Sequence, residues 1–390
     1  MTLESSELHS DGSGTRLRER IAGEIDRNGP IPFSRYMELC LYEPELGYYS
    51  QARERFGKAG DFYTSSDVHA VFGRLLARQF EEMWRLLDSP ERIDLIELGP
   101  GRGLFAGDVL DWSAKQFPAL ARALHYRLVE QSAHLRERLR ERLSEHISAG
   151  RATVFDSLDL AASSANETVI VFANEFFDAL PVEVVDHRGG LRVGFENGRF
   201  VASFTSPSDA ENEFLDRYGV HPEVGERVEA PLASLTWMDR VADVFGGRRG
   251  FAVLIDYGYT REELLAGRHR DTVMAYRQHK ATVSPYEAPG EQDITAHVNF
   301  TALQARGVAR GLDALALLTQ SQFLIGVGEE TQFADAFQEC SPPQERAKVA
   351  LQLKHLIAPS GMGETFQVLL LSHGVAKEKA ARLSGLKLAR

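Results

Sequence analysis

Cysteine is scarce in this 390-residue chain, and long hydrophobic runs and excess positive charge are lacking. The two cysteines, Cys40 and Cys340, are too far apart for a metal-binding motif and too few for a disulfide framework, which predicts no metal site and a reducing, cytoplasmic environment. No apolar stretch approaches the roughly 18 residues of a membrane span, so we expect no membrane insertion. Lys plus Arg number 44 and Asp plus Glu 56, a net charge of −12 that disfavours nucleic acid as a partner.

The composition that is present, 43% hydrophobic and 26% charged residues, is that of a folded globular protein. Short apolar runs alternate with helical patterns, which is typical of an α/β fold with a mainly parallel sheet covered on both faces. The pattern predicts seven strands, which start near Ile93, Tyr126, Ala152, Val169, Phe251, Ala314 and Phe366.

Other segments surround this predicted core, which we place at residues 91–373. Residues 1–14 resemble a flexible tail, 15–90 an N-terminal helical extension, and 374–390 a C-terminal tail. Within the core we expect insertions at about 182–245 and 260–295, the first with β-hairpins and the second a polar loop, and helices at about 329–358.

The most informative motif is a glycine turn between the first strand and the next helix, Glu97-Leu98-Gly99-Pro100-Gly101-Arg102-Gly103. The dinucleotide fingerprint fails here, because Leu104 stands where its last glycine or alanine is required. The pattern acidic-x-Gly-x-Gly-x-Gly instead resembles motif I of class I S-adenosylmethionine methyltransferases. Gly99, Gly101 and Gly103 would then let the cofactor approach the backbone, with the Glu97 carboxylate near its cationic groups.

Three polar residues follow the next two predicted strands. Glu130 stands where this class of enzyme holds the ribose of S-adenosylmethionine, and Asp156 and Ser157 would lie near the adenine. The carboxyl ends of parallel strands bind ligands in open α/β sheets, which favours a shared site. Solvated loop residues are the alternative interpretation for each.

The fourth strand runs into Asn174-Glu175-Phe176-Phe177-Asp178, at the position of the methyl acceptor in class I methyltransferases. Asn174, Glu175 and Asp178 are our catalytic candidates. A carboxylate pair can hold the planar fork of a guanidinium, so a protein arginine is the favoured acceptor. The alternative is that this segment caps a helix beginning near Phe176 and ending at Pro181.

Four segments together resemble the MidA family, the relatives of a mitochondrial complex I assembly-factor arginine methyltransferase. They are Gly60-Asp61-Phe62-Tyr63-Thr64-Ser65, the glycine turn, residues 174–182 and Asp256-Tyr257-Gly258. Further stretches that resemble this family are Tyr42-Glu43-Pro44 and Gly47-Tyr48-Tyr49. The resemblance implies a class I methyltransferase Rossmann-like seven-stranded sheet with added segments, and a loop that closes over S-adenosylmethionine with help from Asp61 and Thr64. It also implies a protein substrate, such as a respiratory-complex subunit.

Two other functions stay open at this point. A catalytically weak or inactive assembly protein could keep the methyltransferase fold and act by docking a partner. A methyltransferase of this fold could also modify a small molecule or a nucleic acid, because a fold does not select its acceptor.

Overall fold

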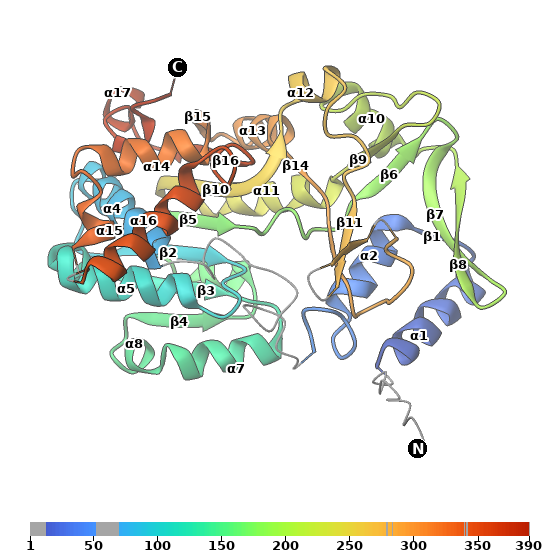
Figure 1. Ribbon diagram of the computed structural model, residues 1–390, viewed down its shortest axis with the longest axis horizontal. Coiled ribbons are helices and arrows are strands. Elements are labelled where there is room, and N and C mark those ends of the chain that lie inside the picture. Colours follow the sequence, from blue (N-terminus) through green and yellow to red (C-terminus); the bar gives the residue numbers. More distant parts are fainter. Residues whose placement is uncertain are drawn as a thin grey trace.

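The computed structural model describes residues 13–51, 70–277, 280–282, 284–338, 340 and 342–389. Asp61 and Thr64, expected to cover the cofactor, lie outside these residues. The central sheet has the order β15-β16-β10-β5-β2-β3-β4, and β14 (Val298–Asn299) pairs with the end of β10 (Figure 1). The seven expected strands are confirmed as β2 (Ile93–Leu98), β3 (Leu124–Val129), β4 (Ala152–Phe155), β5 (Thr168–Asn174), β10 (Arg249–Tyr259), β15 (Asp313–Thr319) and β16 (Phe366–His373).

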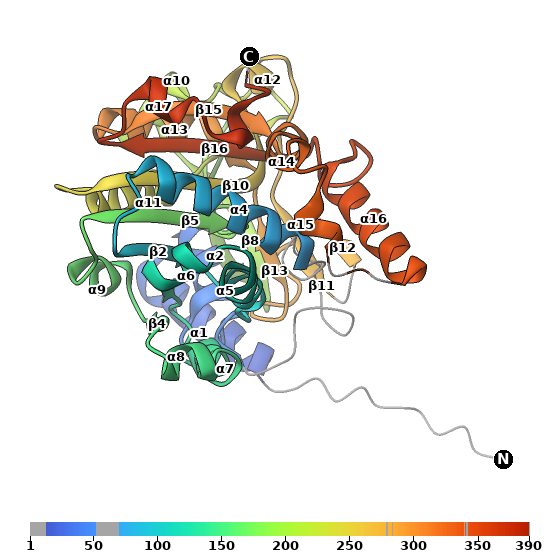
Figure 2. The ribbon, with the colours of Figure 1, turned by 90° about the vertical axis from the view of Figure 1, so that its left-hand side faces the viewer.

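The sheet is mixed, because β16 runs antiparallel to both β10 and β15 while the other neighbouring core strands are parallel. Helices cover both faces (Figure 2). One apolar core lies under α4 (Ala70–Leu86), α5 (Leu104–Gln116), α14 (Gln320–Glu329) and α16 (Pro343–Ile357). The other lies under α9 (Leu158–Ser163), α11 (Leu232–Val244) and α13 (Phe300–Ala309). Shorter helices complete the layers: α6 (Pro118–Ala123), α7 (Ala133–Arg142), α8 (Ser144–Ser148) and α15 (Ala334–Phe337).

Two helices belong to the sheet rather than to the added segments in which we expected them. Phe72 of α4 packs on Phe105 of α5, with ring centroids 5.6 Å apart, so α4 is a core helix and not part of an extension. Met238 and Val241 of α11 are buried with Leu254 of β10, so the first insertion ends before this helix. Burial against the sheet defines a core helix, and that burial depends on contacts distant in sequence.

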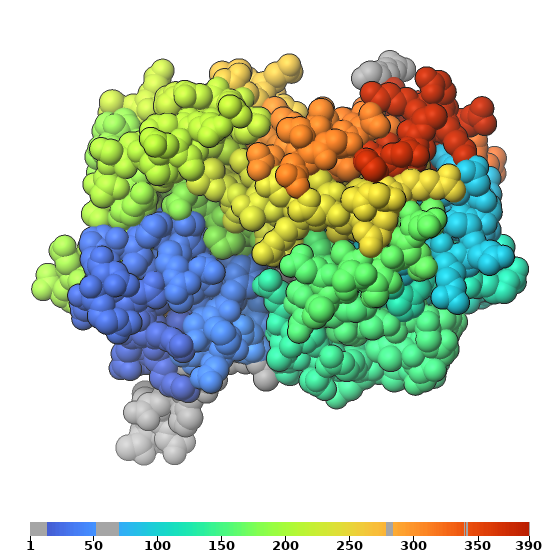
Figure 3. All heavy atoms as spheres, turned by 180° about the vertical axis from the view of Figure 1, so that it is seen from behind, coloured from blue at the N-terminus to red at the C-terminus, as the bar shows by residue number. Residues whose placement is uncertain are grey.

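A second, antiparallel sheet is built from the first insertion. It contains β1 (Ile31–Pro32), β6 (Glu183–Asp186), β7 (Gly189–Glu196), β8 (Arg199–Thr205) and β9 (Arg227–Ala230), which confirms the expected hairpins. Helices α1 (Ser13–Asn28) and α2 (Phe33–Tyr42) share an apolar core with it, and α10 (Asp209–Arg217) follows β8. Figure 3 shows the N-terminal helices and these strands beside each other at one side of the molecule.

The second insertion is more ordered than the expected polar loop. It forms α12 (Arg261–Leu265) and a three-stranded sheet of β11 (Met274–Arg277), β12 (Lys280–Thr282) and β13 (Asp293–Thr295). Ala275 and Ile294 of this sheet are buried in the core of α1 and α2. The sequence did not predict these strands, because they are short and contain polar residues, so apolar and polar side chains do not alternate along them.

Residues after β16, expected as a tail, fold back onto α4. They form α17 (Lys377–Ala380) and a 3-10 helix (Ser384–Leu386). The backbone N–H groups of Ser384 and Gly385 donate to Glu82 and Gln79, at 2.8 and 3.0 Å. Among the described residues, no helix is long and apolar enough to cross a membrane.

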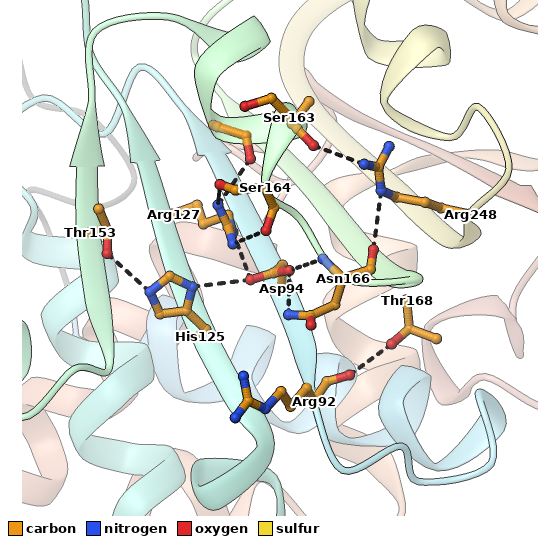
Figure 4. A network of polar contacts seen from close by, with 12 residues as sticks. Arg92, Asp94, His125, Arg127, Thr153, Ser163, Ser164, Asn166, Thr168 and Arg248 are labelled. Atoms are coloured by element: carbon orange, nitrogen blue, oxygen red, sulfur yellow. Dashed lines mark hydrogen bonds and ion pairs between the residues drawn. The ribbon is translucent and has the colours of Figure 1, made fainter.

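A charged network closes the amino end of the central sheet (Figure 4). Asp94 is fully buried and accepts from Arg127 Nε at 2.6 Å and from Asn166 N and Nδ2 at 2.5 and 2.7 Å. His125 Nδ1 lies 3.1 Å from the same carboxylate. Burial alone would raise the pKa of Asp94, but the hydrogen bonds of His125, Asn166 and Arg127 lower it. The negative charge of Asp94 is therefore neutralised by other residues of the chain.

Candidate active site

A cavity of about 520 Å³ opens at the opposite, carboxyl end of the sheet. Its lining comes from the turns after three neighbouring strands, from α11 and from the segment around α2. The lining residues that matter below are Tyr42, Tyr49, Gly99, Gly101, Arg102, Glu130, Asn174, Glu175, Phe176, Asp178, Ala179, Trp237, Arg240 and Asp293. Both the volume and the place in the sheet are typical of a small-molecule site.

The glycine turn after β2 forms one wall of the cavity. Gly99 and Gly101 have φ angles of 64° and 51°, a region that favours glycine. A Cβ atom added to Gly101 would meet no atom within 4 Å among the described residues, so this position borders open space. Gly103 is not among the lining residues, and an added Cβ there would lie 2.6 Å from Leu139 Cδ2 of α7. The structure therefore brings Gly99 and Gly101 to the cavity, whereas Gly103 permits helix packing.

Glu130, directly after β3, lies beside this turn and lines the cavity. Its carboxylate accepts from the backbone N–H of Ser132 at 2.8 Å and interacts with the N–H of Gly101. Burial raises the pKa of Glu130 to about 7, although these backbone donors oppose the shift. A carboxylate held at this position can accept from the two hydroxyl groups of a ribose.

Three other predicted residues are not among those that line the cavity. Glu97 is buried within the sheet, where its carboxylate accepts from the Tyr126 hydroxyl at 2.8 Å, and burial raises the pKa of Glu97 to about 8. Asp156 is exposed after β4, and Ser157 precedes α9. The described part of the chain does not bring these three side chains to the cavity.

The last residue of β5 and those that follow it, which we call the β5 loop (174–181), form a nest of backbone N–H groups around one buried carboxylate. Asp256 Oδ2 accepts from the N–H groups of Phe176, Phe177 and Asp178, at 3.2, 3.0 and 3.2 Å. Glu175 adopts a left-handed conformation with φ of 51°, and its N–H donates to Ile255 O at 3.0 Å. The loop is not helical, so the helix-cap interpretation is wrong.

Two oxygen atoms of the β5 loop are buried without a hydrogen-bond partner among the described residues, Asn174 Oδ1 and Asp178 Oδ1. The other Asp178 oxygen accepts from the Tyr257 hydroxyl at 2.6 Å, and Asn174 Nδ2 donates to Glu175 Oε1 at 3.1 Å. Burial raises the pKa of Asp178 to about 6, although the Tyr257 hydroxyl and the N–H groups of Ala179 and of Asp178 itself oppose the shift. Buried acceptors are normally satisfied, so this wall of the cavity is suited to a ligand that donates hydrogen bonds.

The facing wall was missed in the sequence. The Tyr42 hydroxyl donates to Ala179 O at 2.9 Å, and the Tyr49 hydroxyl donates to Asp293 Oδ1 at 2.8 Å. The two rings stack, with centroids 5.6 Å apart. The segments that hold these tyrosines match the MidA pattern, which was the only signal for them.

Trp237 of α11 is one of three tryptophans scattered along the sequence, and it belongs to none of the motifs identified there. It lines the cavity and packs edge-on against Phe176, with ring centroids 4.9 Å apart. This contact adds an apolar surface beside the glycine turn, since an added Cβ on Gly99 would lie 3.0 Å from Phe176 Cδ2. Flat apolar surfaces of this kind suit an aromatic base.

Residues 75–318, more than half of the chain, match the protein family described as "Putative S-adenosyl-L-methionine-dependent methyltransferase". The chain belongs to this methyltransferase family. A solved structure from Burkholderia thailandensis, a "likely methyl transferase" bound to S-adenosyl-homocysteine, is 30% identical. It superposes with a TM-score of 0.82, covering 100% of this chain and 98% of the other.

Curated relatives of this methyltransferase are similar over nearly their whole length. The Drosophila melanogaster protein arginine methyltransferase NDUFAF7 homolog is 29% identical, with 95% of this chain and 88% of the relative covered. The human protein arginine methyltransferase NDUFAF7 is 28% identical, with 92% and 83% covered.

The protein is therefore an S-adenosylmethionine-dependent methyltransferase, and its cavity fits that cofactor. Gly101, which borders open space, would let the cofactor approach the backbone, and the buried acid Glu130 would accept from its ribose. When bound, S-adenosylmethionine supplies a methyl group activated by the sulfonium. The β5 loop, with two oxygens that have no hydrogen-bond partner among the described residues, lines the rest of the cavity.

Proposed function

We propose that this methyltransferase transfers its methyl group to an arginine side chain of a protein. The observation that carries the proposal is a pair of buried oxygens on cavity-lining residues, Asn174 Oδ1 and Asp178 Oδ1, for which the described part of the chain provides no hydrogen-bond partner. A guanidinium has five N–H donors in a rigid fork and no acceptor, so it complements such a wall.

The charges around the cavity also favour a cationic acceptor. The acidic lining residues are Glu38, Glu130, Glu175, Asp178 and Asp293, and the basic ones are Arg102 and Arg240. A surplus of carboxylates raises the local concentration of cations and repels phosphates. An acceptor in nucleic acid is disfavoured for the same reason.

The β5 loop would position the nitrogen and receive a proton. Asp178 and Glu175 would hold the guanidinium, which localises its positive charge away from the attacking nitrogen. Formation of the N–CH₃ bond and cleavage of the S–CH₃ bond leave a methylated guanidinium and release one N–H proton. Asp178 is placed to take that proton, because burial has raised its pKa to about 6.

Two further points support a protein acceptor. Relatives that cover most of this chain are named protein arginine methyltransferases. A second hollow on α1 and α2 also adjoins the cavity, since Glu38, Tyr42 and Pro44 line both. We propose a cytoplasmic location, because Cys40 and Cys340 are both free thiols.

The test is to incubate the purified enzyme with S-adenosylmethionine carrying a labelled methyl group and a protein extract, then hydrolyse the labelled proteins and analyse their amino acids. We expect labelled methylarginine, which Asp178→Asn and Glu175→Gln should reduce without weakening cofactor binding in calorimetry. Asp156→Asn is the matched control, because this exposed acid lies outside the cavity lining.

Each alternative function gives a different result in this experiment. Label in a small molecule or in another amino acid would contradict an arginine acceptor. Cofactor binding without label in any extract would favour a docking protein on a methyltransferase fold. Equal activity of Glu175→Gln would remove Glu175 from the acceptor site.

A further inference from the structure

We infer that Asp256 and Tyr257 of β10 form a positioning unit that shapes the β5 loop and turns one Asp178 oxygen toward the cationic acceptor. The inference rests on the proposed function and adds two residues to it. Sequence reasoning assigned no role to either, although both lie in the segment Asp256-Tyr257-Gly258 that resembles the MidA pattern.

Asp256 determines the shape of the β5 loop. It is 1% exposed, and its two oxygens accept from four backbone N–H groups, those of Phe176, Phe177 and Asp178 and that of Tyr257 at 2.9 Å. Successive N–H groups that converge on one anion form a stable nest. The nest follows directly on the left-handed residue Glu175, a conformation that is unfavourable unless its surroundings hold it.

Tyr257 determines which Asp178 oxygen stays available. Its hydroxyl donates to Oδ2 at 2.6 Å, while Oδ1 is buried without a partner among the described residues. The phenol ring is itself fixed between Phe366 and His297, with centroid distances of 5.6 and 5.4 Å and nearly perpendicular planes. A rigid donor on one oxygen leaves the other for an N–H group of the acceptor.

Gly258 explains how the unit is held in place. A Cβ atom at this position would lie 2.1 Å from Val298 O, so only glycine lets β14 pair this closely with the end of β10. The close pairing fixes the end of β10, which carries Asp256 and Tyr257. The Asp-Tyr-Gly segment therefore acts as one structural unit.

The first test variant is Tyr257→Phe, which keeps the ring contacts and removes the hydroxyl. We expect unchanged cofactor affinity in calorimetry and a kcat about 10- to 100-fold lower on the peptide in which the wild-type enzyme labels arginine. The acid limb of the kcat profile should move to higher pH, because the Tyr257 hydrogen bond lowers the pKa of Asp178. The other titratable groups that interact with Asp178 stay the same, namely Tyr42, Tyr49, Asp256 and Tyr276.

The second variant is Asp256→Asn, in which the amide retains one acceptor oxygen and adds donors that face the loop N–H groups. We expect a larger loss of kcat than in Tyr257→Phe, again with little change in cofactor affinity. Tyr126→Phe is the matched control, because it removes a buried phenol–carboxylate hydrogen bond to Glu97, outside the cavity lining. Its kcat and pH profile should equal those of the wild type.

The outcomes separate this inference from the proposed function. Wild-type kcat and pH profile in Tyr257→Phe would overturn the inference while arginine methylation stands. Loss of cofactor affinity in both variants would also overturn it, because the residues would then support the whole site. A wild-type enzyme that labels no arginine would overturn the proposed function, and that result appears before any variant is compared.

Discussion

Buried carboxylates at the two ends of the central sheet have opposite electrostatic surroundings. At the amino end, Asp94 is surrounded by donors that include the Arg127 guanidinium, and its pKa is lowered. At the carboxyl end, the donors that Asp178 and Asp256 meet among the described residues are all neutral, and burial raises the pKa of both. An acid neutralised by its own chain stabilises the fold, whereas an acid without a cation is suited to receive one from a ligand.

The largest effect is expected from disrupting the charged network at the amino end of the sheet. Arg127→Met should lower the free energy of unfolding by about 3–5 kcal/mol, because Asp94 would remain as a buried charge without its cation. Chemical denaturation measures the change. Arg140→Met is the control, since it removes only the exposed ion pair with Glu137 and should cost less than about 1 kcal/mol. Equal losses in the two variants would show that the network does not depend on Arg127.

The next effect concerns two left-handed glycines at opposite ends of the sheet. Gly101→Val should weaken S-adenosylmethionine binding at least about 100-fold, or about 2.7 kcal/mol, because the side chain would enter the cavity. Gly150→Val is matched, because Gly150 has a φ of 69° and no described residue lies within 4 Å of an added Cβ, but it lies before β4. It should carry the same backbone strain and keep its cofactor affinity. Calorimetry that found equal affinities would contradict the assigned cofactor wall.

Replacing a buried aspartate by asparagine should change the stability of the protein in opposite directions at the two ends of the sheet. For Asp178, a pKa of about 6 against an ordinary 3.8 means that stability falls as pH rises from about 4 to 6. Asp178→Asn should therefore stabilise the protein at pH 7 by about 1–3 kcal/mol. Asp94→Asn should destabilise the protein at pH 7. The pKa of Asp94 is lowered in the folded state, so its carboxylate contributes stability at pH values above its ordinary pKa. If thermal unfolding showed that both variants change stability in the same direction, the contrast between the two ends of the sheet would be wrong.

The smallest expected effect concerns Glu130 at the carboxyl end of the sheet and the pH dependence of cofactor affinity. Glu130 has a pKa of about 7, and its ionised form is the better acceptor for ribose hydroxyls. Cofactor affinity should therefore increase several-fold between about pH 6 and pH 8 in the wild type. Glu130→Gln should abolish this dependence and weaken binding at pH 8 about 10-fold, or about 1.4 kcal/mol. A pH dependence that persists in the variant would have to come from another group.

Much of the fold could be predicted because buried parallel strands appear as short apolar runs, as at Val169 and Phe251. The glycine turn and the β5 loop were recognisable for a similar reason, since each is continuous in sequence. The facing wall was not, because its hydrogen bonds join residues 137 and 244 positions apart, Tyr42 with Ala179 and Tyr49 with Asp293. Asp156 shows the converse limit, since a strand end does not determine whether a side chain reaches the cavity.

The hydrogen bonds of Tyr42 and Tyr49 have a consequence for how such enzymes can diversify. Tyr42 joins α2 to the β5 loop, and Tyr49 joins the segment after α2 to β13, whereas the turns after β2 and β3 line another part of the cavity. With the acceptor bound at the β5 loop as proposed, substitutions in the added segments around α2 and β13 would alter which molecule is modified without disturbing the methyl donor. A protein engineer who wants a new target would exchange these two segments together and leave the sheet untouched.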